Sequence, residues 1–159
     1  MKRYFTFPNP VNEISARIVA GGMATLTALA LALGEPWLVV AMAALFAAHV
    51  LAGPRISPLA RAALALGARL PFDKRYVPGP PKRFAQGIGL VVTTTAAILL
   101  LGFGASTPGW ALVTLILVFA TLEAGFAICA GCEIFKVLMR LRLVPAGVCR
   151  ECASVWVAR

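Results

Sequence analysis

Four apolar stretches, each near the length that a helix needs to cross a bilayer, constrain the fold of this chain most strongly. A spanning helix takes about 20 mostly apolar residues. Short connections rich in Gly and Pro separate the first stretch from the second and the third from the fourth. An N-cap and first-turn signal at Asn9-Pro10 suggests that the first helix begins before the lipid. The predicted spans are residues 14–33, 37–53, 84–104 and 110–129.

The composition agrees with a membrane protein and excludes the usual basic soluble protein. Hydrophobic residues make up 60% of the 159 positions, charged residues only 13%, and the mean hydropathy is +0.88. A net charge of +9 would suggest nucleic acid as a partner of a soluble chain. Because so little polar surface is available, we expect the lipid bilayer as the partner and no nucleic acid.

The positive charges are sorted along the chain, and their positions predict the orientation. All fifteen Lys and Arg lie in residues 1–17, in the connection 54–83, or in the tail after residue 135. The two short connections contain none. With four spans the three basic segments share one side, which the positive-inside rule makes the cytoplasm. We therefore expect both termini to be cytoplasmic.

The long central connection holds a further predicted helix. Ser57-Pro58 begin a segment in which Arg61 and Arg69 lie on one side of a helical wheel, opposite a face rich in Leu and Ala. This pattern predicts an interfacial helix between spans two and three, and the alternative is a short helix packed on the bundle. The predicted fold class is thus all-α, an integral membrane four-helix bundle in one domain, residues 1–159, with a short cytoplasmic C-terminal helix and tail at 130–159.

Two CxxC pairs are the main chemical feature. Cys129 and Cys132 follow the fourth span, and Cys149 and Cys152 come after sixteen intervening residues. A two-residue gap lets two sulfurs converge on each other as a disulfide or on one metal ion. The spacing of the two pairs lies in the range typical of a four-cysteine zinc site, and a reducing cytoplasm keeps thiols available as ligands.

A redox or sulfur-transfer role is the other interpretation of these thiols. A helix expected over residues 133–143 would place Cys132 at its N-terminus, where backbone amides stabilise a thiolate, with Lys136 one turn on. Cysteines that only pack are the third alternative. The three interpretations remain open at this point.

Glu123 is the one acidic residue deep in an apolar stretch. A carboxylate there costs about 2.5 kcal/mol or more unless it is paired, protonated or faces a cavity. We expect Arg17 or His49 to partner it, either in a structural pair or with Glu123 as a proton acceptor beside the thiols. His49 itself is expected to be a packing residue, and Gln86 and the run 93–95 of threonines to form interhelical hydrogen bonds.

Several strings together resemble a bacterial membrane family known as domain of unknown function 4395. They are FPNPVNEISAR, PPKRFAQGIG, LEAGFAICAGCEIF and LVPAGVCREC. The resemblance implies a small four-helix protein of the bacterial inner membrane, and supplies no activity. It also implies association with thioredoxin-like or rhodanese-type sulfurtransferase proteins. The positions that match the motifs are Asn12, Glu13, Arg17, Gln86, Glu123, Cys129, Cys132, Cys149 and Cys152.

The function expected from the sequence is thiol-disulfide exchange or sulfur handling, an oxidoreductase activity carried by Cys129, Cys132, Cys149 and Cys152 with Glu123. No cofactor is needed for that chemistry. A scaffold stapled by zinc on the four cysteines is the alternative, and a transporter of a small sulfur compound, based on Glu123 and the threonine run, is the second. Small-residue faces on the first and third helices predict that a second copy completes the packing.

Overall fold

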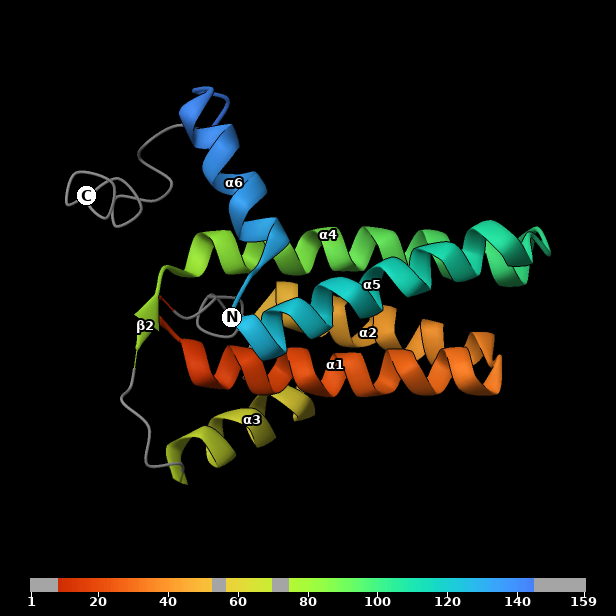
Figure 1. Ribbon diagram of the computed structural model, residues 1–159, viewed down its shortest axis with the longest axis horizontal. Helices are drawn as coiled ribbons and strands as arrows, with labels where there is room; N and C mark the ends of the chain where they lie inside the picture. The colour runs from red at the N-terminus through yellow and green to blue at the C-terminus, as the bar shows by residue number, and fades with distance from the viewer. Residues whose placement is uncertain (1–8, 53–56, 70–74, 145–159) are drawn as a thin grey trace.

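Long apolar helices lying side by side make up most of the molecule (Figure 1). The computed structural model describes residues 9–52, 57–69 and 75–144. It confirms an all-α bundle of the membrane type. The helices are α1 Glu13–Leu33, α2 Pro36–Ala52, α3 Pro58–Arg69, α4 Gly79–Ala97, the π-helical extension η2 Ile98–Gly102, α5 Ser106–Phe126 and α6 Ala130–Arg140. Two residues of β1 (Val11–Asn12) pair antiparallel with β2 (Tyr76–Val77).

Three of the helices are long and apolar enough to cross a membrane: α1, α4 with η2, and α5. The fourth predicted span corresponds to α2, which is apolar but has only 17 residues. At 1.5 Å per residue it is about 26 Å long, close to the lower limit for a span. Large apolar side chains point outward from the bundle, Val91 being 65% exposed. This outward apolar surface suits helices surrounded by lipid.

The interior of the bundle is small and tightly packed. Helix α1 packs mainly against α5, and α2 mainly against α4. Between them lies a core in which Met42, Val39 and Val113 are completely buried. At Gly89 on α4 a Cβ atom would lie 2.4 Å from the ring of Phe46 on α2. Only glycine therefore permits this approach of α4 to α2.

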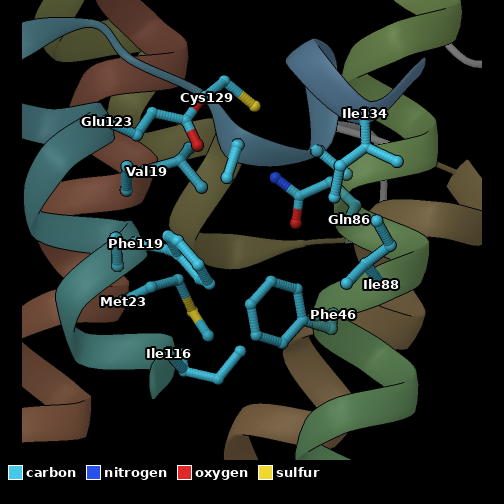
Figure 2. A pocket seen from close by; sticks show the side chains of 16 residues that line it. Val19, Met23, Phe46, Gln86, Ile88, Ile116, Phe119, Glu123, Cys129 and Ile134 are labelled. Carbon is cyan, nitrogen blue, oxygen red and sulfur yellow. The ribbon is translucent and has the colours of Figure 1, made fainter. Parts of the chain in front are cut away.

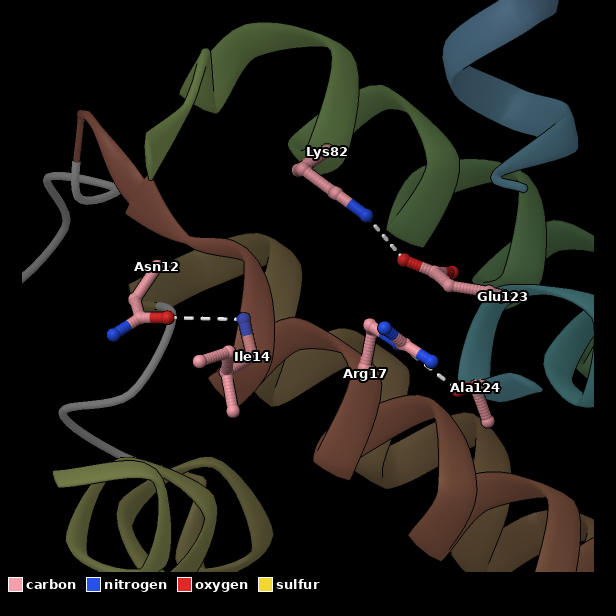
Figure 3. A network of polar contacts seen from close by, with 6 residues as sticks. All are labelled: Asn12, Ile14, Arg17, Lys82, Glu123 and Ala124. Carbon is pink, nitrogen blue, oxygen red and sulfur yellow. Dashed lines mark hydrogen bonds and ion pairs between the residues drawn. The ribbon is translucent and has the colours of Figure 1, made fainter. Parts of the chain in front are cut away.

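Helix α1 begins later than the Asn9-Pro10 signal suggested. Asn12 is its N-cap, and the Asn12 Oδ1 accepts a hydrogen bond of 2.9 Å from the Ile14 N–H (Figure 3). The chain is extended up to Asn12 because β1 pairs with β2. Asn9 acts on a different helix: its Oδ1 accepts a 2.9 Å hydrogen bond from the Gly79 N–H at the first residue of α4.

Helix α3 combines features of both predicted alternatives. Its small residues Ala60, Ala63 and Gly67 are buried, and it packs against α1. Its Leu64 and Leu66 are exposed.

The described parts of the basic segments lie at one end of the bundle. Figure 1 places β2, α3, α6 and the beginnings of α1 and α4 at that end, while the α1–α2 and η2–α5 turns lie at the other. Two arginines at the basic end bind helix C-termini. The Arg17 side chain donates to the carbonyls of Ala124 (3.0 Å) and Gly125 (2.7 Å) in α5, and Arg83 donates to the Val50 carbonyl in α2 (3.1 Å). A cation there complements the helix dipole and the unpaired carbonyls.

Candidate functional site

The first CxxC pair lies where the chain turns from α5 into α6. Helix α5 ends at Phe126, and Ala127 adopts a left-handed conformation with φ 59° that reverses the chain. Helix α6 begins at Ala130, three residues before the start expected from the sequence, so Cys129 and not Cys132 is the residue at its N-cap. Both cysteines are free thiols, with Cys129 buried and Cys132 half-buried.

Glycine between the two cysteines holds α6 directly against α4. A Cβ atom on Gly131 would lie 2.5 Å from both the Cα and the Cβ of Ala85. One turn further, the rings of Phe84 and Phe135 pack with their centroids 5.4 Å apart. The position of the thiols relative to the bundle is therefore fixed by backbone contact as well as by side chains.

The two thiols interact with each other and differ in acidity. A hydrogen bond from the Cys132 thiol lowers the pKa of Cys129 and outweighs burial and the Glu123 charge, which both act to raise it. The positive charge of Lys82 and the backbone N–H of Cys132 lower it further. The same thiol-thiol hydrogen bond, with burial, raises the pKa of Cys132. The pKa of Cys129 is thus the lower of the two.

Glu123 is paired with Lys82, which belongs to the basic connection 54–83 and was not among the expected partners (Figure 3). The two side chains are only 11% and 16% exposed. The expected partners Arg17 and His49 were wrong. Arg17 binds α5 carbonyls, and His49 Nδ1 and Nε2 contact the Leu45 carbonyl (2.7 Å) and the Ser57 hydroxyl (3.2 Å).

Lys82 was missed because the apolar stretch was taken to start at Phe84. Helix α4 begins at Gly79, with prolines at its first positions, so Lys82 lies in its first turn and its side chain is buried within the bundle. The proline pair before the lysine is the signal that could have revealed the earlier start. His49, by contrast, is a satisfied packing residue, as expected.

A cavity of about 110 Å³ lies beside these groups (Figure 2). Cys129, Glu123 and Gln86 lie toward one end of it, and Phe46, Met23 and Ile116 toward the other. The Oε1 atom of Gln86 is buried and accepts no hydrogen bond from the residues that the structure describes. The cavity therefore joins a polar end next to a thiol to an apolar interior.

Two further predictions concern the threonine run and the four-cysteine zinc site. The hydroxyls of Thr93 and Thr95 donate to carbonyls of their own helix, Gly89 (2.7 Å) and Val91 (2.8 Å), and not across helices as predicted. Cys149 and Cys152 lie outside the described residues. Within residues 9–52, 57–69 and 75–144 no three potential ligands gather into a metal site, and the four-cysteine zinc site stays a prediction.

With this geometry in place, the comparisons with known proteins identify the family. The family model described as domain of unknown function (DUF4395) matches residues 11–140. The chain belongs to the DUF4395 family. The match includes Lys82, Glu123 and the first cysteine pair, and ends before Cys149. No curated protein and no solved structure matches the chain. The family confirms the resemblance and leaves the chemistry to be argued from the site.

Proposed function

We propose that this DUF4395 protein is a thiol-disulfide exchange protein of the bacterial inner membrane, in which Cys129 and Cys132 cycle between dithiol and disulfide. The observation that carries the proposal is the contact between the Cys129 and Cys132 thiols at the start of α6, where Cys129 is buried in the same cavity as Glu123. An attacking thiolate and a protonated resolving thiol are what exchange needs.

In the proposed reaction the Cys129 thiolate attacks one sulfur of a disulfide RS–SR. The S–S bond breaks, RS⁻ leaves with the electron pair, and Cys129 carries the mixed disulfide. Cys132 then loses its proton and attacks the Cys129 sulfur, which releases the second RS⁻. The two protons that Cys129 and Cys132 gave up convert the products to two RSH, and we assign the relay of one to the Glu123 carboxylate, which lines the same cavity as Cys129. A dithiol partner of the thioredoxin-like or sulfurtransferase class resets the pair by the reverse exchange.

The proposed setting is a four-span protein with its basic end and both termini in the cytoplasm. The grouping of basic segments at one end of the bundle supports this orientation. The thiols then face a compartment that contains protein dithiols. Cys149 and Cys152, in the tail, are proposed to exchange with the first pair, and a second copy of the chain is proposed to complete the packing.

The test is a redox titration of the full-length protein in its native membrane, with thiols trapped by a mass-shifting maleimide. We expect Cys129 and Cys132 to convert together between dithiol and disulfide over a narrow range of glutathione potential. A Cys132→Ser protein should retain a mixed disulfide on Cys129, because no second thiol of the pair resolves it, and a Cys129→Ser protein should not.

A different result separates this proposal from the zinc scaffold. Two results together would contradict thiol exchange and favour the zinc scaffold. They are about one zinc per chain, lost in a Cys149→Ser variant, and no disulfide at any potential. Metal analysis is therefore carried out on the same preparation.

A further inference from the structure

The cavity beside Cys129 has the size of a small organic molecule. Its volume of about 110 Å³ is less than the roughly 150 Å³ of an apolar protein cavity that holds a benzene ring. It lies among α1, α2, α4 and α5, with the start of α6 across its polar end. A protein substrate cannot enter such a space, whereas a molecule with one or two carbons on each sulfur can.

The residues that line the cavity disfavour a charged ligand. Among the residues that the structure describes, no Lys or Arg lines the cavity, and the one acidic group there, Glu123, is already neutralised by Lys82. Phe46, Met23 and Ile116 make the remainder apolar. A charged ligand would lose its hydration without gaining a counter-ion from the lining, which costs several kcal/mol. An uncharged ligand loses little.

Gln86 provides the polar contact. Its Oε1 atom is buried at the cavity, and among the described residues it has no donor. A buried acceptor gains from a donor supplied by a ligand. The S–H group of a small thiol is such a donor, and Cys129 lines the same cavity, so a ligand bound here lies next to the sulfur with which it would react.

We infer that this cavity is the substrate site for a small uncharged sulfur compound, a short dialkyl disulfide that enters and the corresponding alkyl thiol that leaves. The inference rests on the proposed thiol exchange and names its substrate class. Cys129 takes one alkylthio group from the disulfide. The S–S bond breaks, and the other alkylthio group leaves with the electron pair as a thiolate. It takes up the proton that Cys129 released and departs as the alkyl thiol, whose S–H group donates to Gln86 Oε1.

The experiment measures how fast Cys129 is modified by methyl methanethiosulfonate and by its anionic sulfonatoethyl analogue. It uses the full-length protein in detergent with Cys132, Cys149 and Cys152 each changed to Ser, so that one cysteine remains. Rates are divided by those of the same protein unfolded in SDS. We expect the folded protein to favour the neutral reagent by at least about tenfold.

The second part of the experiment fills the cavity with a larger side chain. Ala120 lines the cavity, and Ala111 lies on the exposed face of the same helix. Ala120→Leu should slow the neutral reagent by about tenfold, Ala120→Val by less, and the control Ala111→Leu by less than about twofold. Should Ala120→Leu fail to fold, Ala120→Val and the comparison of reagents still decide the question.

The outcomes distinguish the inference from the proposed function. Equal normalised rates for the two reagents, or no effect of filling the cavity, overturn the inference while the redox titration of the native cysteines stands. A native pair that never forms a disulfide overturns the exchange function, whatever the reagent preference.

Discussion

At the scale of single residues, a hydrogen bond between two sulfurs decides the chemistry of the site. Burial alone would raise the pKa of both thiols. The pKa of Cys129 is lowered because Cys132 donates a hydrogen bond to it, and this effect exceeds those of burial and Glu123. Lys82 contributes as a nearby cation, although its main contact is Glu123. The reactivity of Cys129 should therefore depend most on its partner cysteine.

The pH dependence of Cys129 alkylation tests this dependence. Only the thiolate reacts, so the rate rises with pH and its midpoint follows the pKa. Because the pKa is lowered, the midpoint in the folded protein should lie below that of the unfolded chain. Cys132→Ala should move the midpoint upward, and Cys132→Ser should move it less since a hydroxyl can still donate. Iodoacetamide rates from pH 5 to 10, with the tail cysteines changed to Ser, provide the measurement.

The buried pair of Lys82 and Glu123 has a clear stability signature. Lys82→Met leaves a carboxylate without its cation and should lower the free energy of unfolding by about 3 kcal/mol. The double variant Lys82→Met/Glu123→Leu should recover most of that loss, because no unpaired charge remains. Unfolding by SDS in mixed micelles measures both.

The matched control for this pair is Lys136→Met. Lys136 bonds Glu133 within α6, where the two side chains are 36% and 60% exposed. Removing an exposed pair should change stability by less than about 0.5 kcal/mol. A loss at Lys82 no greater than at Lys136 would contradict the structural role given to the buried pair.

At the scale of elements, the contact of α6 with α4 places the thiols. Gly131 touches the Ala85 backbone, whereas a Cβ on Gly87 would meet nothing within 4 Å. Gly131→Ala should push α6 away and cost about 1–3 kcal/mol. Gly87→Ala should be neutral or stabilise by up to about 1 kcal/mol through helix propensity.

Two measurements check this prediction. Thermal unfolding in detergent gives the stabilities, and the yield of the Cys129–Cys132 disulfide under mild oxidation reports the geometry of the site. An unchanged melting temperature and disulfide yield in Gly131→Ala would show that α6 can sit elsewhere.

Apolar length was enough to predict the long helices, whereas the packing around Glu123 and the first cysteine pair was predicted only in part. The helices follow from stretches of hydrophobic residues, a strong local signal. The pairing of Lys82 with Glu123 could not be predicted, because it depends on where α4 begins and on which face of it meets α5. The sequence predicts Cys132 at the N-terminus of a helix over residues 133–143, whereas α6 begins at Ala130 with Cys129 as its N-cap, because helix ends are weakly encoded.

At the scale of the whole molecule, charge separates the two ends of the bundle. The α1–α2 turn contains Glu35 and no cation, while α3, α4 and α6 carry basic residues at the opposite end. Arg17 and Arg83 are held at that end by the carbonyls of α5 and α2. The separation of charge between the two ends is thus built into the packing as well as into the connections.

Single cysteines introduced at the two ends test the topology. In a chain without its own four cysteines, Glu35→Cys and Ser106→Cys should react with an impermeant maleimide added to intact cells, and Tyr76→Cys should react only after the cells are opened. The reverse pattern would place the native thiols outside the cytoplasm and remove the basis for a cytoplasmic exchange partner.

The close contact of Gly131 with Ala85 also affects how another protein can detect whether Cys129 and Cys132 are thiols or a disulfide. The two sulfurs already lie within hydrogen-bonding reach of each other, and the backbone between them is pressed against a neighbouring helix. Forming or breaking the Cys129–Cys132 disulfide then requires little movement of α6, so we expect the dithiol and disulfide forms to have nearly the same shape. Under the proposed exchange, a partner therefore has to react with the sulfurs themselves, because a protein that recognises only the shape of α6 would not distinguish the two forms.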